Sequence, residues 1–305
     1  MSAMPSADVD DALLQPQRAL LDARFAQRLV ALPSGARLAV RECGARDASK
    51  TSDERPSLVL LHGISSGAAS WLHAALALSD AHHVVAWDAP GYGDSTPLAA
   101  ADPTDGDYAA RLHELLLALG IERCVLVGHS LGALMGSAYA RGPGAGRVQR
   151  LVLISPAGGY GAPAQAEAQA RVRRERHAAL QTQGVAGMAA KIADRLLSPA
   201  ASPEARAWVR WNTARLQPEG YLQAVELLCG SDLGASRGRL AMPVEVHVGE
   251  ADVVTTPAAC RGWAEVLGAP FGLIAGAGHA SPVEQPGAVA RVLAQAAQTV
   301  EARHG

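Results

Sequence analysis

The sequence predicts an α/β fold in which helices cover both faces of a mostly parallel central sheet. Short continuous apolar runs recur along the chain, and such runs are typical of strands buried on both faces. Segments with helical periodicity separate them, which indicates parallel strands joined by right-handed crossovers. One interval, residues 158–240, has helical patterns but no comparable strand, and it is too long for an ordinary connection. We therefore expect a helical cap inserted into the sheet domain.

The amino-terminal part of the chain is expected to precede the parallel strands. Residues 1–24 predict one amphipathic helix, whose apolar stripe consists of Leu13, Leu14, Leu20 and Leu21. Two segments with alternating polarity, 27–32 and 37–43, flank the turn-forming Pro33-Ser34-Gly35 and predict a β-hairpin. Residues 44–57 are polar and are expected to form a loop.

Strands and helices then alternate up to the insertion and resume after it. The predicted strands are residues 58–61, 84–87, 124–127, 151–154, 244–248 and 271–274. The predicted helices outside the insertion are residues 68–79, 105–119, 130–141, 257–267 and 287–301. We assign residues 1–157 and 241–305 to one core domain, with 1–24 as an extension of it and 158–240 as the cap.

The composition excludes several classes of protein. Of the 305 residues, 49% are hydrophobic and 18% are charged, so the chain can bury a core and is not expected to be disordered. The net charge of -2 gives no general attraction to nucleic acid or to an anionic membrane. The four cysteines lack metal or redox spacing, and no run approaches the roughly 18 apolar residues of a membrane span. We expect a cytoplasmic monomer or homodimer that acts on a small molecule, without nucleic-acid or membrane partners.

The strongest motif is Gly128-His129-Ser130-Leu131-Gly132, which matches the pattern G-x-S-x-G. It lies directly after a predicted strand and directly before a predicted helix, and the motif requires that context. The serine must sit on a sharp, strained turn, and the glycines on either side leave room for it. Such a turn presents the Ser130 hydroxyl and directs the Leu131 N–H toward a developing oxyanion. The motif predicts Ser130 as a nucleophile rather than an incidental serine of a glycine-rich turn.

A serine nucleophile needs a base, and His279 is the best placed of the ten histidines. It follows the last predicted strand, at the carboxyl edge where open parallel sheets place their active sites. Asp252 follows the strand at 244–248 and is expected to orient the imidazole. Glu250 competes for that role, but we interpret it as a solvent-facing carboxylate. His129 adjoins the nucleophile, but neighbouring side chains on this turn are expected to point apart.

The second oxyanion donor is expected in the loop after the third strand, residues 62–67. Gly63 permits close approach of the backbone, and Ile64 would present its N–H. His62 is expected to brace this loop by hydrogen bonding rather than to transfer protons. The turn at residues 88–95, rich in glycine and proline, is expected to have a structural role that supports the site.

Taken together, these motifs resemble the serine-dependent α/β-hydrolase family from about residue 28 to residue 300. The resemblance implies a catalytic triad of Ser130, Asp252 and His279, with Ile64 and Leu131 as oxyanion donors and no metal or organic cofactor. Within the family, Gly276-Ala277-Gly278-His279 and Val283-Glu284-Gln285-Pro286 are similar to the end of 3-oxoadipate enol-lactonases. The chain also resembles hydrolases of ring-fission products and non-haem haloperoxidases.

Two departures leave the reaction open within this family. Hydrolases of carbon–carbon bonds usually carry Trp where this chain has Ala280, and enol-lactonases usually carry Arg where it has Pro90. The resemblance implies hydrolysis of an ester, enol-lactone or related carbonyl in a small molecule, with aromatic breakdown products as a possible source. The alternatives are carbon–carbon bond hydrolysis and, from another class, a ligand-binding module without activity.

The substrate pocket is expected to be mainly apolar and to be closed by the cap. The candidate lining residues are Ser66, Trp71, Tyr160, Trp208, Trp211 and Tyr221. Basic residues of the cap are interpreted as a solvated helix face, with the alternative that one of them binds a substrate carboxylate. These residues are Arg171, Arg173, Arg174, Arg176, Arg210 and Arg215.

Overall fold

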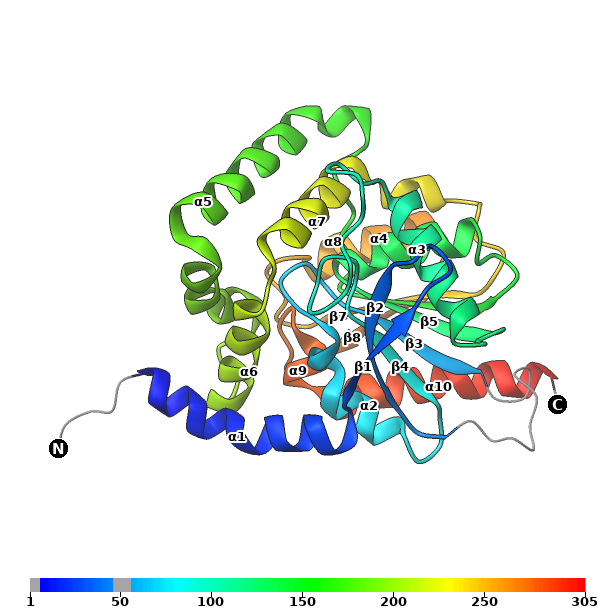
Figure 1. The fold of residues 1–305 in the computed structure, drawn as a ribbon. Coiled ribbons are helices and arrows are strands. Elements are labelled where there is room, and N and C mark those ends of the chain that lie inside the picture. Colours follow the sequence, from blue (N-terminus) through cyan, green and yellow to red (C-terminus); the bar gives the residue numbers. More distant parts are fainter. Residues whose placement is uncertain (1–5, 46–55, 305) are drawn as a thin grey trace.

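The computed structural model describes residues 6–45 and 56–304, and its central element is a sheet covered by helices (Figure 1). Eight described strands follow the order β1-β2-β4-β3-β5-β6-β7-β8. Their bounds are β1 Gln27–Ala31, β2 Arg37–Cys43, β3 Ser57–Leu61, β4 Val84–Trp87, β5 Cys124–His129, β6 Val148–Ile154, β7 Val244–Gly249 and β8 Phe271–Ile274. The β1–β2 and β2–β4 pairs are antiparallel and the other neighbours are parallel. The predicted hairpin and mostly parallel sheet are confirmed.

Helices cover the sheet on both faces. Three of them lie on one face: α1 (Ser6–Arg24), α2 (Leu72–Leu78) and α10 (Pro286–His304). On the other face lie α3 (Asp105–Ala118), α4 (Leu131–Arg141) and α8 (Pro257–Leu267). The predicted stripe of α1 is confirmed, because Leu14 and Leu21 are buried against the sheet side while Leu13 and Leu20 are partly buried. A short 3₁₀ turn, η1 (Ala68–Trp71), begins the helix predicted at 68–79.

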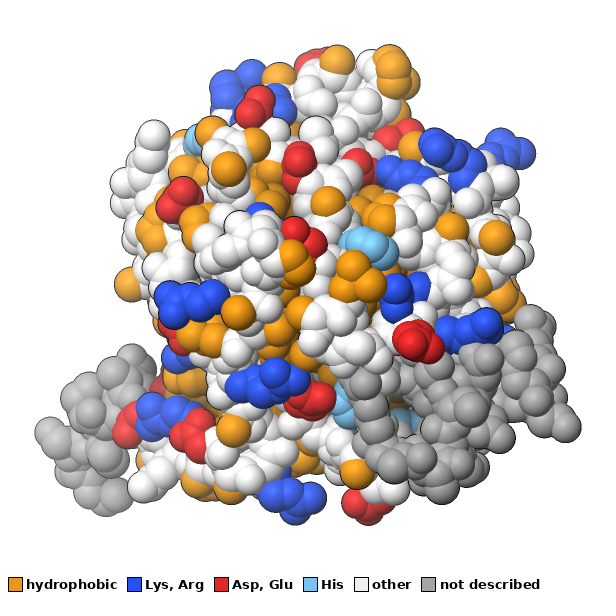
Figure 2. Space-filling model, turned by 45° about the vertical axis from the view of Figure 1, so that its right-hand side comes forward, with side chains coloured by type: hydrophobic (Ala, Val, Ile, Leu, Met, Phe, Trp, Pro, Cys, Tyr) orange, Lys and Arg blue, Asp and Glu red, His pale blue; other side chains and the backbone are white. Residues whose placement is uncertain are grey.

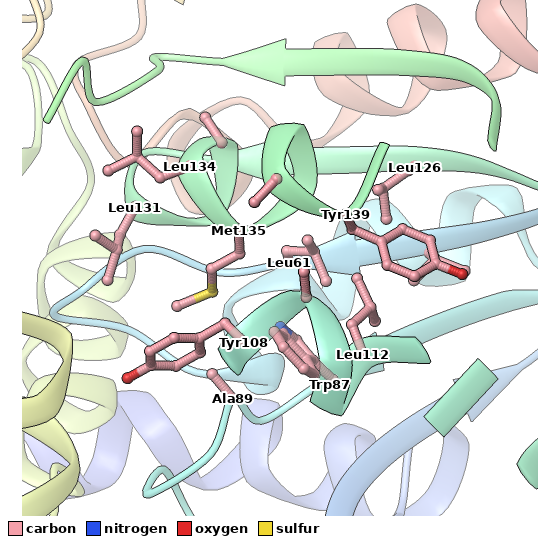
Figure 3. Packing of buried hydrophobic residues seen from close by; sticks show 14 of the residues in the cluster. Leu61, Trp87, Ala89, Tyr108, Leu112, Leu126, Leu131, Leu134, Met135 and Tyr139 are labelled. Atoms are coloured by element: carbon pink, nitrogen blue, oxygen red, sulfur yellow. The ribbon is translucent and has the colours of Figure 1, made fainter. Parts of the chain in front are cut away.

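The continuous apolar runs reflect burial on both faces of the sheet. In β3, Leu58 and Leu60 belong to the core under α2 and α10, whereas Val59 and Leu61 belong to the core under α3 and α4. Successive side chains of a strand point to opposite faces, so both sets must be apolar. Figure 3 shows the second core, where Met135 of α4 points toward Tyr108 of α3 and Trp87 of β4. This packing fixes the amino-terminal end of α4 against the carboxyl edge of the sheet.

The strand β8 is an exception to this pattern. Phe271 and Gly272 are only half-buried, and Leu273 is 51% exposed. The expectation that the run at 271–274 is covered on both faces is therefore wrong. The reason is topological, because β8 is the edge strand and pairs only with β7 among the described residues.

Between β6 and β7 the described chain contains helices and no strand. We call residues 163–236 the helical segment; it comprises η2 (Pro163–Gln165), α5 (Ala166–Leu196), α6 (Pro203–Ala214), α7 (Pro218–Gly230) and η3 (Leu233–Ser236). Figure 1 shows α5, α6 and α7 grouped at one side of the sheet. The helix α5 is broken at Gly184, whose φ of 62° and ψ of 177° are not helical. The boundary of the cap at residues 158–240 stays a prediction.

Polar contacts attach the helical segment to the rest of the molecule. The buried amide of Gln223 in α7 donates to the carbonyl oxygen of Leu98 at 2.7 Å and accepts from the Leu98 N–H at 3.2 Å. In α6, Arg210 Nε donates to Asp10 of α1 at 2.7 Å. The amino-terminal helix thus contacts the helical segment as well as the sheet. In the described part of the chain, no helix is both long and apolar enough to cross a membrane.

Candidate active site

Ser130 lies on a strained turn between β5 and α4. Its φ is 53° and its ψ is -114°, a backbone conformation that a residue with a side chain rarely adopts. A Cβ atom at Gly128 would lie 2.5 Å from the carbonyl oxygen of Gly132, and one at Gly132 would lie 2.5 Å from that of Leu61. Both positions therefore require glycine, for the reason that the motif predicted.

His279 and Asp252 form a buried hydrogen-bonded pair. The distance from His279 Nδ1 to Asp252 Oδ2 is 2.9 Å, and the two residues are 4% and 3% exposed. The other carboxylate oxygen of Asp252 accepts the N–H groups of Val254 at 2.7 Å and Thr255 at 3.0 Å. Burial alone would raise the pKa of Asp252, but the hydrogen bonds from His279 and the two N–H groups lower it below its ordinary value. A charged Asp252 keeps the proton of His279 on Nδ1 and leaves Nε2 as an acceptor.

Thr255 completes this pair and was missed in the sequence. Its hydroxyl lies 2.9 Å from Asp252 Oδ2, 3.0 Å from the carbonyl oxygen of Ser155 and 3.2 Å from His279 Nδ1. The available signal was local, because an aspartate often accepts N–H groups two and three residues ahead in a turn. Glu250, the competitor, is exposed and accepts the Gly276 N–H at 3.2 Å, away from His279.

Hydrogen bonds between uncharged groups hold the loop after β3 in place. His62 Nδ1 donates to the Gly63 carbonyl at 2.8 Å, and its Nε2 accepts the Ala89 N–H at 3.0 Å. Burial lowers the pKa of His62, which favours this neutral form. The Tyr92 hydroxyl donates to the carbonyl of Ile64 at 2.8 Å. The expected bracing role of His62 is therefore confirmed, and residues of the turn at 88–95 contribute to it.

The side chain of His129 contacts the backbone of His279 rather than its neighbour Ser130. Its Nε2 donates to the carbonyl oxygen of His279 at 2.8 Å, and the two rings lie 5.1 Å apart. Burial lowers the pKa of His129 to about 3. His129 is therefore a neutral imidazole, and it supports the backbone of His279.

Ser130 and His279 open onto one cavity of about 300 Å³. Ile64 and Leu131, the two expected oxyanion donors, line the same cavity. The structure thus brings together four of the five residues named from the sequence, and Asp252 lies behind His279. The other side chains around the cavity include Gln165, Arg176, Ile192, Arg195, Leu196, Leu228 and Trp263.

The expected pocket residues divide into two groups. Ser66 and Tyr160 line the cavity. Trp71 and Trp208 do not, because both are fully buried in the core under α2 and α10. Trp211 stacks on Trp208 at 4.6 Å between ring centres, also outside the cavity. For these three residues the expectation is corrected, since their apolar area packs helices together.

Tyr221 is also absent from the cavity wall. It lines an adjoining hollow of about 380 Å³, where its hydroxyl accepts from Arg176 Nη1 at 3.3 Å. The tryptophan at the cavity is instead Trp263 of α8, whose ring lies 2.2 Å from where a Cβ at Gly158 would be. No feature of the sequence distinguished Trp263 from the other tryptophans, because its position depends on how α8 packs beside the Gly158 backbone.

The fold and this site define an α/β enzyme with a serine on a strand–turn–helix elbow. A model of the alpha/beta hydrolase family matches residues 58–292, and the chain belongs to that family. The resemblance inferred from the motifs and the expected fold and enzyme class are thereby confirmed.

Comparison with known proteins gives the following similarities. RutD of Escherichia coli, for which carbamate hydrolysis is proposed, is 38% identical over 87 residues, or 28% of this chain. The match spans about a third (33%) of the length of that curated relative. A thermophilic esterase from Thermogutta terrifontis superposes with a TM-score of 0.76 and 24% identity, covering 90% of this chain and 99% of the esterase. The enol-lactonase of Burkholderia xenovorans LB400 gives 0.76 and 25%, covering 88% and 98%.

Proposed function

We propose that this protein is a serine hydrolase that needs no cofactor and cleaves a carboxylic ester, enol-lactone or related carbonyl compound. The observation that carries the proposal is the position of Ser130, which lies on a strained elbow and faces the same cavity as His279. The pair of His279 with the charged Asp252 supports it, because such a pair leaves Nε2 free to accept a proton. The substrate is a small molecule, in keeping with the cavity size.

The proposed reaction has two halves. Ser130 Oγ attacks the substrate carbonyl while His279 Nε2 accepts the hydroxyl proton, and the N–H groups of Ile64 and Leu131 stabilise the oxyanion. His279 returns the proton to the leaving group, and an acyl group remains on Ser130. A water molecule, deprotonated by His279, then attacks this acyl group and releases the acid. Asp252 holds the imidazole tautomer throughout, and Thr255 holds Asp252.

Activity should decrease on acidification, because a protonated His279 cannot accept the Ser130 proton. The initial rate on an uncharged ester, measured from neutral to acidic pH with the fold monitored by circular dichroism, tests this expectation. A rate that does not change with pH while the fold is intact would contradict the mechanism.

The central test replaces the nucleophile. Ser130→Ala should lower kcat by about 10⁴- to 10⁶-fold without loss of the folded state. A fluorophosphonate probe should label the unmodified protein and Ser66→Ala, a cavity-lining control, but not Ser130→Ala. Full activity of Ser130→Ala would show that Ser130 is not the nucleophile. A folded, unmodified protein that the probe does not label would favour a ligand-binding module.

The bond that is cleaved can be determined with a substrate panel. A phenyl ester, an enol-lactone and a dienoate ketone from ring fission would be assayed in parallel, each with the Ser130→Ala control. We expect the two oxygen esters to react faster, because they place a phenoxide or enolate leaving group next to His279. A faster reaction of the ketone would assign carbon–carbon bond hydrolysis instead.

A further inference from the structure

The charge of the Ser130 cavity is one-sided. Its wall includes the guanidinium-bearing Arg176 and Arg195, and no aspartate or glutamate side chain lies in the wall among the described residues. Both arginines belong to α5, but they lie on opposite sides of the break at Gly184. The break folds the two halves of the helix around the same cavity. Charges are arranged differently outside, where basic and acidic side chains are interspersed over the face in Figure 2.

These two arginines also differ from Arg173 and Arg206 in what they bind. Arg173 pairs with Glu226 at 2.8 Å and Arg206 pairs with Asp194 at 2.8 Å. Arg176 donates only to the neutral Tyr221 hydroxyl, at 3.3 Å, and Arg195 has no ion pair or hydrogen bond within the described residues. Two other arginines that were candidates for binding a substrate carboxylate have partners of their own. Arg210 pairs with Asp10, and Arg215 lies 4.7 Å above the Trp211 ring.

The positive charge continues into the adjoining hollow. Arg176 and Arg195 line this second space as well, and Lys191 joins them there. Its only described carboxylate is that of Glu175, which lies 3.8 Å from Arg171. Two cationic groups therefore stand at the junction of both spaces with no acidic side chain between them and Ser130.

The surroundings of the arginines would strengthen binding of an anion. Ile192, Arg195 and Leu196 follow a helical spacing of three and four residues, so apolar and cationic side chains share one face of α5. Leu228 adds a further apolar group to the wall. An ion pair next to apolar groups is less screened by water than one on an open surface, which applies to the half-buried Arg176 more than to the exposed Arg195. A guanidinium also matches the two oxygens of a carboxylate.

We propose that the site takes esters or lactones that carry a free carboxylate, which Arg176 and Arg195 bind while Ser130 attacks the carbonyl at the other end. This inference rests on the proposed function. It explains why two cations line a cavity that is otherwise mainly apolar. The carboxylate contact would hold the substrate in one orientation, with the scissile carbonyl toward the N–H groups of Ile64 and Leu131.

A matched pair of substrates tests the inference. The acyl chains of 4-nitrophenyl monoadipate and 4-nitrophenyl hexanoate are equally long, and they differ by a terminal carboxylate in place of a methyl group. We expect kcat/KM to favour the monoadipate by at least about tenfold. Arg176→Gln and Arg195→Gln should each lower kcat/KM for the monoadipate by about 10- to 100-fold, mainly through KM, and change the hexanoate by less than about threefold.

The control variant is Arg174→Gln, which removes an exposed arginine of α5 that does not line the cavity. It should leave both substrates unchanged. If hexanoate hydrolysis depends on Ser130 but the carboxylate gives no advantage, the anion site is refuted and the serine hydrolase stands. The anion site is equally refuted if both arginine variants lose both substrates to the same extent.

A binding measurement keeps the anion site testable even if neither ester is cleaved. Adipate should bind the Ser130→Ala variant in calorimetry, and the affinity should decrease about tenfold or more when Arg176→Gln or Arg195→Gln is added. Adipate binding without ester cleavage or probe labelling would refute the proposed hydrolysis and retain the anion site. Absence of adipate binding, or binding that ignores both arginines, would overturn the inference.

Discussion

At the scale of single residues, the two histidines beside Ser130 serve different ends because their environments differ. His279 faces a carboxylate at 2.9 Å and opens onto the cavity. His129 lines the same cavity but faces a backbone carbonyl, and burial lowers its pKa to about 3. Access to the cavity therefore does not distinguish the two histidines, whereas the negative partner of His279 does.

The lowered pKa of His129 predicts an acid-dependent loss of stability. Between its ordinary pKa of 6.5 and about 3, the unfolded chain binds a proton on His129 that the folded chain does not. The free energy of unfolding should consequently decrease on acidification by about 1.4 kcal/mol for each pH unit in this interval. His129→Gln can still donate to the His279 carbonyl but does not titrate, so it should remove this part of the slope.

Urea unfolding at several pH values between 7 and 4 measures the effect. His177→Gln, which replaces a half-buried histidine of α5 that contacts Glu226, is the comparison variant for loss of a histidine elsewhere. An identical pH dependence in the original protein and in His129→Gln would show that His129 is not buried in its neutral form.

At the scale of secondary-structure elements, the loop that carries His279 is fastened to the end of α5. Glu284, in the short helix α9 (Ser281–Glu284), accepts the Gly278 N–H at 2.7 Å and the Ser198 N–H at 3.0 Å. The Ala280 N–H donates to the carbonyl oxygen of Leu196 at 2.7 Å. The position of His279 thus depends on the helical segment, about 80 residues away in sequence.

We predict that Glu284 acts as a positioning residue for His279. Glu284→Gln keeps the size of the side chain but substitutes an amide group for one acceptor oxygen. It should lower kcat by about tenfold and leave KM nearly unchanged, because the cavity wall is preserved while the base is less well placed. Steady-state kinetics on a neutral ester measures this.

The comparison variant is Glu250→Gln, since Glu250 also accepts an N–H of the same turn, that of Gly276 at 3.2 Å. Glu250 is exposed, and its replacement by Gln should change kcat by less than about twofold. Equal effects of the two variants, or a KM effect alone for Glu284→Gln, would argue against a positioning role.

At the scale of the whole molecule, the break in α5 shapes the cavity. Gly184 has a φ of 62° and a ψ of 177°, a conformation that is essentially restricted to glycine. A Cβ at this position would meet nothing within 4 Å, so its cost would be conformational rather than steric. The glycine lets Arg176 and Arg195, on the two halves of one helix, face the same space.

Gly184→Ala should therefore destabilise the protein by about 1 to 3 kcal/mol. Gly262 in α8 is the matched control, because it is helical and a Cβ there would also meet nothing within 4 Å. Gly262→Ala should stabilise the protein by about 0.5 to 1 kcal/mol. Urea unfolding compares the two, and a Gly184→Ala variant as stable as the original protein would mean that the break is not required.

The sequence by itself determined the sheet, the hairpin, the elbow and the residues Ser130, Asp252 and His279. These features are encoded locally: buried strands require continuous apolar runs, and the turn at Ser130 requires glycine at 128 and 132. The edge position of β8 was not encoded in this way, because an apolar run does not state which strands will pair beside it.

Only the tertiary structure decided which side chains surround the site. Trp71, Trp208 and Trp211 pack helices together. Trp263, Thr255, Arg176 and Arg195 line the cavity instead. The sequence pattern says that a helix has an apolar face, but not which element that face meets. In the helical segment that choice follows from the break at Gly184 and from contacts with residues far away in the chain, such as Leu98 and Gly278.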